Sequence, residues 1–228
     1  MIVRRLINDR HTLPLKQMAS YRNQWQWAKM KGSAACLKWS FRDLLNLERT
    51  LGFVKRRDVV VQAGGNLGLF PKRLAESFRH VLSFEPDPQL YAWAKHNAPE
   101  QNVKLVRAAI GNSHDGVELS QRRRDASGRP THEGLTHVSG AGNIRQVMSD
   151  DYDLPACDLI YLDIEGYELN ALKGGIETIK KHRPVIAVEI NRNINYYGTT
   201  PDGLRSWICG LGYRFVFSMN SDEVFQPC

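Results

Sequence analysis

Short apolar runs alternate with segments of helical character between residues 59 and 219. Apolar runs bounded by turn residues predict buried strands. These runs occupy 59–61, Val81–Phe84, Val103–Val106, Leu159–Leu162 and Val185–Ile190. Apolar spacing or helix-boundary residues predict helices between the runs, at 67–78, 88–97, 169–179 and 201–211. An alternating strand at 213–219 and its partner at Asp222–Phe225 predict a closing hairpin. The order of elements predicts an α/β fold with a mostly parallel sheet.

The first strand runs into a glycine-rich turn that carries the most specific signal in the chain. Residues 59–68 read Val-Val-Val-Gln-Ala-Gly-Gly-Asn-Leu-Gly, which is a strand, a tight turn and the start of a helix. Glu85 ends the next strand, 17 residues after Gly68. Nucleotide-binding βαβ folds place an acid on ribose hydroxyls at a similar offset of roughly 20 residues. The spacing therefore predicts an adenosine-containing ligand.

The turn does not match the motifs that hold phosphates. It contains neither G-x-G-x-x-G nor the Gly-Lys-Ser/Thr of a P-loop. The remaining pattern, G-x-N-x-G, lets the backbone approach a ligand closely without gripping a phosphate. This favours S-adenosylmethionine (SAM). The alternative is a plain structural turn between a strand and a helix.

A second motif, Asp-Leu-Ile-Tyr-Leu-Asp-Ile-Glu-Gly-Tyr-Glu, spans residues 158–168. Its strand ends in Asp163 and Glu165, and the strand after the next helix ends at Glu189. In open α/β sheets, ligands bind beyond the carboxyl ends of the strands. We therefore expect Gly64, Glu85, Asp163 and Glu189 to face one crevice.

At these residues the chain resembles the FkbM-type SAM-dependent methyltransferases. The resemblance rests on residues 61–70, 82–88 and 162–175, supported by Ala-Ala-Ile-Gly at 108–111 and Arg-Pro-Val-Ile-Ala-Val-Glu at 183–189. It implies a Rossmann-like class I methyltransferase fold, with a seven-stranded sheet that has one reversed strand and helices on both faces. It also implies methyl transfer to hydroxyl oxygens, mostly of sugars or related metabolites.

The cofactor contacts are predicted at the ends of the first four strands. With the resemblance, they are Gln62, Gly64, Gly65, Asn66, Gly68, Glu85, Pro86, Asp87, Ala108, Ala109 and Asp163. Glu85 is assigned to the ribose hydroxyls, and the resemblance places adenine against Ala108 and Ala109. Asp87 has an alternative role, as the cap of the helix that begins at Pro88. The family usually has Asp where this chain has Gln62, so we expect weaker cofactor binding or compensation by Asp163.

Methyl transfer to a hydroxyl requires removal of the hydroxyl proton by a base or activation by a metal ion. Asp163 and Glu165 are the leading candidates, and His137 is a further candidate base. Asp163 and Glu165 are also compatible with Mg²⁺ or Ca²⁺, but the sequence does not require a metal and we assign no metal ligand. The structural alternatives are a helix cap for Asp163, a dipole interaction for Glu165, and pairing of Glu189 with Arg192.

The positive charge of the chain is concentrated at its N-terminus. Residues 1–57 hold 13 Lys and Arg against 3 Asp and Glu, whereas the remainder holds 18 against 21. We predict a basic N-terminal helical extension at 1–57, with helices near 13–31 and 38–51, and a methyltransferase domain at 58–228. The extension is either a cap on the sheet or a surface for anionic glycans, phosphates or nucleic acid. Arg122–Arg124 lie in a polar loop that either selects substrate or has no role.

Three functions follow from these features. The first is a SAM-dependent O-methyltransferase that acts on a saccharide or related small molecule. The second is a methyltransferase that acts on nucleic acid through the basic N-terminus and Arg122–Arg124. The third is a non-catalytic SAM-binding module, motivated by Gln62. The sequence has no long apolar run, no signal-peptide pattern and no Cys-x-x-Cys pair, so we expect a cytoplasmic protein with no membrane span and no zinc site.

Overall fold

The computed structural model describes residues 43–121 and 136–228. The predicted helix at 13–31, most of the basic N-terminal segment and the Arg122–Arg124 cluster therefore lie outside the described residues.

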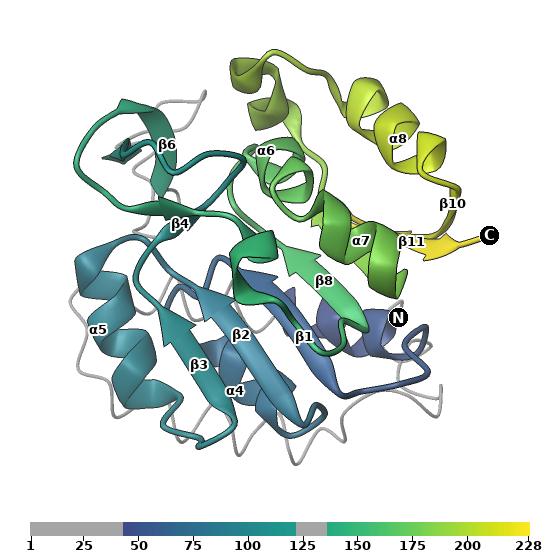
Figure 1. Ribbon diagram of the computed structural model, residues 1–228, viewed down its shortest axis with the longest axis horizontal. Helices are drawn as coiled ribbons and strands as arrows, with labels where there is room; N and C mark the ends of the chain where they lie inside the picture. Colours follow the sequence, from purple (N-terminus) through teal and green to yellow (C-terminus); the bar gives the residue numbers. More distant parts are fainter. Residues whose placement is uncertain (1–42, 122–135) are drawn as a thin grey trace, which may run out of the picture.

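A seven-stranded sheet forms the centre of the molecule (Figure 1). Side by side, its strands are β10 (Tyr213–Met219), β11 (Asp222–Pro227), β9 (Val185–Glu189), β8 (Leu159–Leu162), β1 (Val59–Ala63), β2 (His80–Phe84) and β3 (Val103–Val106). β11 is antiparallel to both of its neighbours, and the other pairs are parallel. This confirms the predicted sheet with one reversed strand, and the predicted strand bounds agree to within two residues.

Helices cover both faces of the sheet because its strands are apolar on both sides. Val60 packs in a cluster with α4 (Leu69–Ala75), α5 (Pro88–Asn97) and the helical residues 43–51. The next residue, Val61, packs on the opposite face in a cluster with α6 (Glu168–Lys173), α7 (Ile176–His182) and α8 (Pro201–Gly210). The alternation along β1 therefore joins two layers of helices through one buried strand.

One predicted helix is two helices in the structure. The periodicity at 169–179 predicts a continuous helix, whereas α6 ends at Lys173 and α7 begins at Ile176. A Cβ atom on Gly174 would lie 1.7 Å from the backbone oxygen of Gly111, so the chain passes too close there for a side chain. Asp150 then accepts hydrogen bonds from the amides of Glu177 and Thr178 at 3.0 and 2.8 Å, which starts the second helix.

The described part of the N-terminal extension packs on the core. Leu44, Leu47 and Leu51 are buried against the sheet. Glu48 forms a buried, two-pronged ion pair with Arg73 of α4, with N–O distances of 2.6 and 3.0 Å. Residues 43–54 are thus part of the same hydrophobic core, and the domain division at residue 57 stays a prediction.

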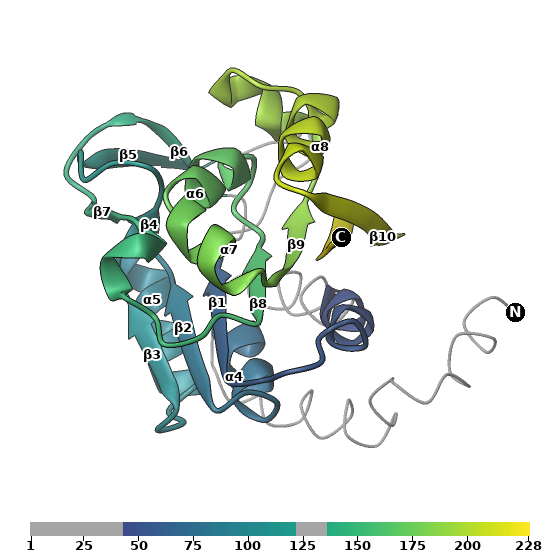
Figure 2. The ribbon, with the colours of Figure 1, turned by 45° about the vertical axis from the view of Figure 1, so that its right-hand side comes forward.

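Small elements stand beside the carboxyl end of the sheet. β5 (Val117–Gln121) and β6 (Thr136–Ala141) form an antiparallel hairpin, which lies near α6 in Figure 2. β4 (Ala109–Ile110) pairs with β7 (Gln146–Val147), and two 3-10 helices, η3 (Ser149–Tyr152) and η4 (Arg192–Tyr197), complete this region. Within the described residues, no helix has the length and apolar character needed to cross a bilayer.

Candidate functional site

The glycine turn lies between the ends of β2 and β8. Gly64 has a φ of 84°, and a Cβ atom there would lie 2.0 Å from the backbone oxygen of Asp163. The amides of Gly64 and Gly65 both donate to the carbonyl of Phe84, at 3.2 and 3.0 Å. A side chain at residue 64 would therefore disturb both neighbouring strand ends. The turn holds the backbone of three strands close together at the crevice.

The side chain of Gln62 supports the glycine turn through hydrogen bonds. Its side chain is fully buried, on the face of the sheet that also carries Val60. Ser83 Oγ donates to Gln62 Oε1 at 2.5 Å, and Gln62 Nε2 donates to the carbonyl of Gly64 at 3.0 Å. Both polar atoms are engaged within the protein, so Gln62 fixes the position of Gly64. Its direct contact with the cofactor stays a prediction.

Glu85 is brought against the glycine turn, as the sequence predicts. It is only 4% exposed, and its two oxygens accept hydrogen bonds from the amides of Asn66 at 2.6 Å and Asp87 at 3.0 Å. Burial raises the pKa of Glu85 to about 7, against the lowering effect of these two amides. One carboxylate thus links the loop after β1 to the loop after β2.

The other predicted cofactor residues surround this link. Asp87 accepts from the amides of Gln89 and Leu90 at 2.8 and 2.9 Å, so its carboxylate caps α5, as the alternative role required. Ala108 and Ala109 are buried, and the amide of Ala109 donates to the carbonyl of Arg145 at 2.9 Å. Pro86 lies between Glu85 and this cap. The adenine contacts at 108 and 109 stay predictions.

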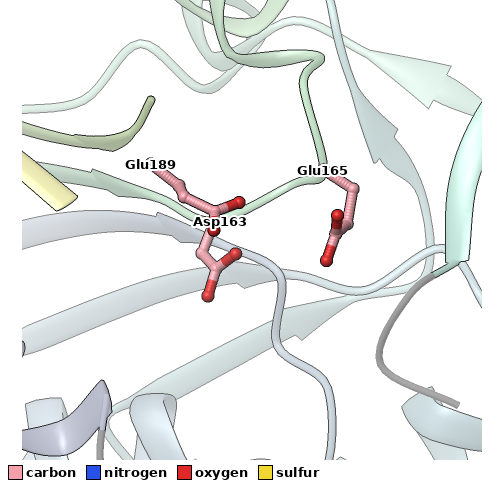
Figure 3. Close-up of side chains that lie close together, drawn as sticks. All are labelled: Asp163, Glu165 and Glu189. Carbon is pink, nitrogen blue, oxygen red and sulfur yellow. The ribbon is translucent and has the colours of Figure 1, made fainter. Parts of the chain in front are cut away.

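Three carboxylates meet where β8 and β9 end (Figure 3). Asp163 and Glu165 follow β8, and Glu189 is the last residue of β9. One oxygen from each lies within 4.8 Å of the other two. We call these residues the acid trio. The structure therefore brings together both carboxylates that the sequence selected as catalytic and adds Glu189 to them.

The members of the acid trio differ in their hydrogen-bond donors. Glu189 accepts from Asn191 Nδ2 at 2.7 Å and from Ser221 Oγ at 3.0 Å, rather than from Arg192. Glu165 Oε2 accepts from Asn193 Nδ2 at 2.7 Å. In the described part of the chain, no group donates a hydrogen bond to the Asp163 carboxylate.

The structure does not give Asp163 its alternative role as a helix cap, since no side chain caps the N-terminus of α6, and Glu168 rather than Glu165 is the acid in the first turn of that helix. Glu168 Oε1 accepts from the amides of Ile164 and Gly166 at 3.1 and 3.3 Å. Glu168 is fully buried, and burial raises its pKa to about 8. Glu165 itself has a φ of 56°, a conformation that costs energy for a residue with a side chain. The loop after β8 is therefore held in a strained shape by neighbouring contacts.

The acid trio has an excess of negative charge. Burial, followed by repulsion from Glu189, Asp222 and Glu165, raises the pKa of Asp163 well above its usual range. Burial and Asp222 likewise raise the pKa of Glu189. Asp222 lies opposite Glu189 in the sheet and accepts from Tyr161 Oη at 2.8 Å. A bound cation would relieve this repulsion, and each ionised carboxylate is a candidate proton acceptor.

His137 lies apart from the acid trio, in the wall of a pocket of about 750 Å³. The pocket lies between the β5–β6 hairpin and η4, and we call it the tyrosine pocket. Its lining includes Tyr167, Tyr196, Tyr197, Ser113, Asp115, Ser139 and Gln146. As a candidate base, His137 therefore belongs to this pocket, and its catalytic role stays a prediction.

Some of these residues escaped the sequence analysis. Asp222 was assigned only to a strand, and its place beside Glu189 depends on the antiparallel pairing of β11 with β9. Tyr167 immediately precedes α6, and Tyr196 and Tyr197 belong to η4, so all three are far from the hairpin in sequence. The paired tyrosines at 196 and 197, just before a glycine, were the only local signal.

Comparison with known proteins agrees with this architecture. The sequence model described as the Methyltransferase FkbM domain matches residues 58–215. The chain is 23% identical over 165 residues to the hexuronic acid methyltransferase AglP of Haloferax volcanii, with 69% of this chain and 67% of AglP covered. It is 24% identical over 164 residues to the 2-O-methyltransferase NoeI of Sinorhizobium fredii, with 63% of this chain and 67% of NoeI covered.

A solved structure shows the same fold. The crystal structure of the methyltransferase FkbM from Methylobacillus flagellatus KT is similar with a TM-score of 0.51 and 15% sequence identity. The similarity covers 93% of this chain but only 59% of that chain, so the chain spans less than two thirds of this structural relative.

Proposed function

The chain belongs to the FkbM methyltransferase family, and from this premise we propose that it is a SAM-dependent O-methyltransferase acting on a hydroxyl of a saccharide or related small molecule. The observation that carries this proposal is the half-buried Asp163 carboxylate. It receives no hydrogen bond from the described residues, and the backbone of Asp163 lies directly against the glycine turn. Two relatives whose names describe methylation of a hexuronic acid and of a 2-O position support a sugar hydroxyl as the acceptor.

The residues at the crevice fit the chemical groups of SAM. Glu85 already accepts two hydrogen bonds from backbone amides, and its oxygens are suited to ribose hydroxyls. Asp163 lacks a cationic partner among the described residues, and it is surrounded by like charges, so it is suited to the ammonium group of the methionine part. This placement compensates for the missing charge at Gln62. When bound, SAM supplies a methyl group on a sulfonium for in-line displacement.

We assign the removal of the acceptor proton to Glu165. The carboxylate takes the proton from the hydroxyl as the new carbon–oxygen bond forms and the carbon–sulfur bond breaks, which leaves a neutral thioether. Both oxygens of Glu189 already accept hydrogen bonds from Asn191 and Ser221, which hold this carboxylate in place as a structural group. Glu165 also lies two residues before Tyr167, in the loop that leads to the tyrosine pocket.

A divalent cation is a second way to neutralise the acid trio. Carboxylate oxygens are the ligands that Mg²⁺ and Ca²⁺ prefer, and three such oxygens lie within 4.8 Å of one another. Our proposal assigns Asp163 to an ammonium group and requires no metal. We therefore expect turnover to persist after treatment with EDTA. Loss of turnover that Mg²⁺ or Ca²⁺ restores would instead assign the trio to a metal.

Calorimetry and product analysis together test the proposed function. The parent protein is titrated with SAM and then incubated with a panel of mono- and disaccharides and RNAs, with methylated products detected by mass spectrometry. We expect SAM binding and a methylated saccharide. Binding without any product would favour a non-catalytic module, and a methylated RNA whose binding weakens steeply with salt would favour the nucleic-acid alternative. No SAM binding at millimolar concentration would contradict the proposal.

A further inference from the structure

We propose that the tyrosine pocket binds the sugar ring of the acceptor, beside the hydroxyl that Glu165 deprotonates. This inference rests on the proposed function and adds a binding site to it. The pocket volume of about 750 Å³ falls within the range of small-molecule sites, roughly 300–1,000 Å³. Its lining combines aromatic rings with short polar side chains, which is the combination that a polyhydroxylated ring requires.

Two segments of the chain connect the pocket with the acid trio. The first is the loop after β8, which carries Glu165 and then Tyr167. The second is η4, in which Asn193 donates to Glu165 and Tyr196 and Tyr197 line the pocket. A ring held by these tyrosines therefore lies beside the loop that carries the proposed base. In both segments, a residue of the acid trio or its hydrogen-bond donor comes shortly before the tyrosines that line the pocket.

Hydrogen bonds hold the walls of the pocket in a fixed shape. Tyr197 Oη donates to the carbonyl of Val138 at 2.6 Å and so ties η4 to the hairpin. The rings of Tyr167 and Tyr197 meet edge to face, with centroids 5.0 Å apart. Tyr167 Oη donates to Gln146 Oε1 at 3.0 Å, and Gln146 Nε2 donates to Ser113 Oγ at 2.8 Å. A pocket fixed in this way loses little entropy when a ligand binds.

Tyr196 gives the pocket a platform for a ring. It is 69% exposed, and the only other large apolar side chain with comparable exposure among the described residues is Phe215, at 52%. The face of an aromatic ring is electron-rich and attracts the C–H hydrogens of a sugar, which their hydroxyl groups make slightly positive. Ser139 and His137, together with Asp115, offer donors and acceptors for the hydroxyls on the ring edge.

The test measures sugar binding directly, so that it does not depend on turnover. Methyl β-D-glucoside and methyl β-D-glucuronide are titrated into the parent protein and three variants, and saturation-transfer NMR reports contact with the sugar C–H protons. Tyr196→Ala removes the platform, Tyr196→Phe keeps the ring, and Phe215→Ala removes an exposed ring on β10 instead. We expect binding of at least one glycoside to weaken about tenfold in Tyr196→Ala and to stay within about twofold in the two controls.

Three results would overturn the inference. They are the absence of binding by either glycoside at millimolar concentration, equal binding by the parent and Tyr196→Ala, and tighter binding of phenol than of both sugars at the same site. Calorimetry with SAM on the same samples keeps the two proposals apart. Loss of SAM binding with intact sugar binding would contradict the proposed function alone, whereas intact SAM binding and turnover with no effect of Tyr196→Ala would contradict the tyrosine pocket alone.

Discussion

Two acids at the carboxyl end of the sheet have opposite surroundings. Glu85, at the end of β2, accepts hydrogen bonds from two backbone amides, and its pKa rises only to about 7. Asp163, at the end of β8, accepts none from the described residues, and burial and repulsion from four other carboxylates raise its pKa well above the usual range. One acid is prepared for neutral donors such as hydroxyls, and the other for a cation. SAM carries both kinds of group, with hydroxyls on its ribose and an ammonium on its methionine part.

This contrast supports our proposal that Asp163 supplies the charge that Gln62 lacks. Gln62 cannot attract an ammonium group, and its polar atoms are engaged by Ser83 and Gly64. The acids have instead gathered at the ends of the strands beyond β1, with Asp163 after β8, Glu189 on β9 and Asp222 on β11. Four changes test the different roles of the Glu85 side and the Asp163 side.

The largest effect is expected from Glu165, the proposed base of the acid trio. Glu165→Gln removes the proposed base and keeps a hydrogen-bond acceptor for Asn193, so kcat should fall by about 10²- to 10⁴-fold with SAM affinity nearly unchanged. Glu189→Gln is the matched control, and its effect on kcat should be smaller. Steady-state kinetics with a methylated saccharide as product checks both variants. If Glu189→Gln lowered kcat more than Glu165→Gln did, the assignment of the base would be wrong.

The next largest effect is expected from Gly64, whose backbone contacts the strand ends that lead to Glu85 and Asp163. Gly64→Ala forces a side chain into a positive-φ position and within 2.0 Å of the Asp163 carbonyl oxygen. The strain and the displaced strand end together should lower the free energy of unfolding by about 2–4 kcal/mol. Gly140→Ala is the control, since a Cβ atom there meets nothing within 4 Å. Chemical denaturation measures both variants, and equal stability of the two would show that the turn tolerates a side chain.

The Glu85 side of the crevice could be predicted well from the sequence. The glycine turn, Glu85 and the cap at Asp87 lie within local strand–turn–helix units, whose geometry is set by neighbours in the chain. The seven-stranded sheet with one reversed strand followed from the resemblance to the FkbM family, whereas the order of the strands depends on long-range pairing and was not predicted. Asp163 and Glu165 were also found from a local signal, since both lie in the loop directly after β8.

The Asp163 side was predicted less completely because its remaining parts come from distant segments. Asp222 reaches the acid trio only through the register of β11 with β9. The tyrosine pocket depends on Tyr197 of η4 meeting Val138 of the hairpin, 59 residues away in sequence. The break between α6 and α7 was missed because it results from close approach of Gly174 to Gly111, which no helical periodicity records.

A third change tests the charge of Asp163 with almost no change of shape. Asp163→Asn should weaken SAM binding about 10- to 100-fold, because a charge-assisted hydrogen bond becomes a neutral one. The same change removes a carboxyl group whose ionisation the fold disfavours, so the free protein at pH 8 should gain about 1 kcal/mol, seen as roughly 2–4 °C in melting temperature. Calorimetry and thermal unfolding measure the two effects. Weaker binding together with lower stability would indicate a structural role only.

The smallest effect, and the one that most directly separates the two acids, is the pH dependence of SAM binding. Because the pKa of Glu85 in the folded protein is about 7, a proton occupies its carboxylate below that pH and competes with the ribose hydroxyls. Protonation of Glu85 should therefore raise the dissociation constant for SAM about tenfold for each pH unit below 7. The folding stability of the free protein should show the opposite trend with pH. A pKa raised from 4.5 to about 7 favours folding at low pH, and this contribution is lost as pH rises through 7. Glu85→Gln cannot titrate, so calorimetry between pH 5.5 and pH 8 should show a shallower slope for this variant, with any remaining slope due to Asp163. An unchanged slope would place the titrating group elsewhere and leave Glu85 without its proposed contact to ribose.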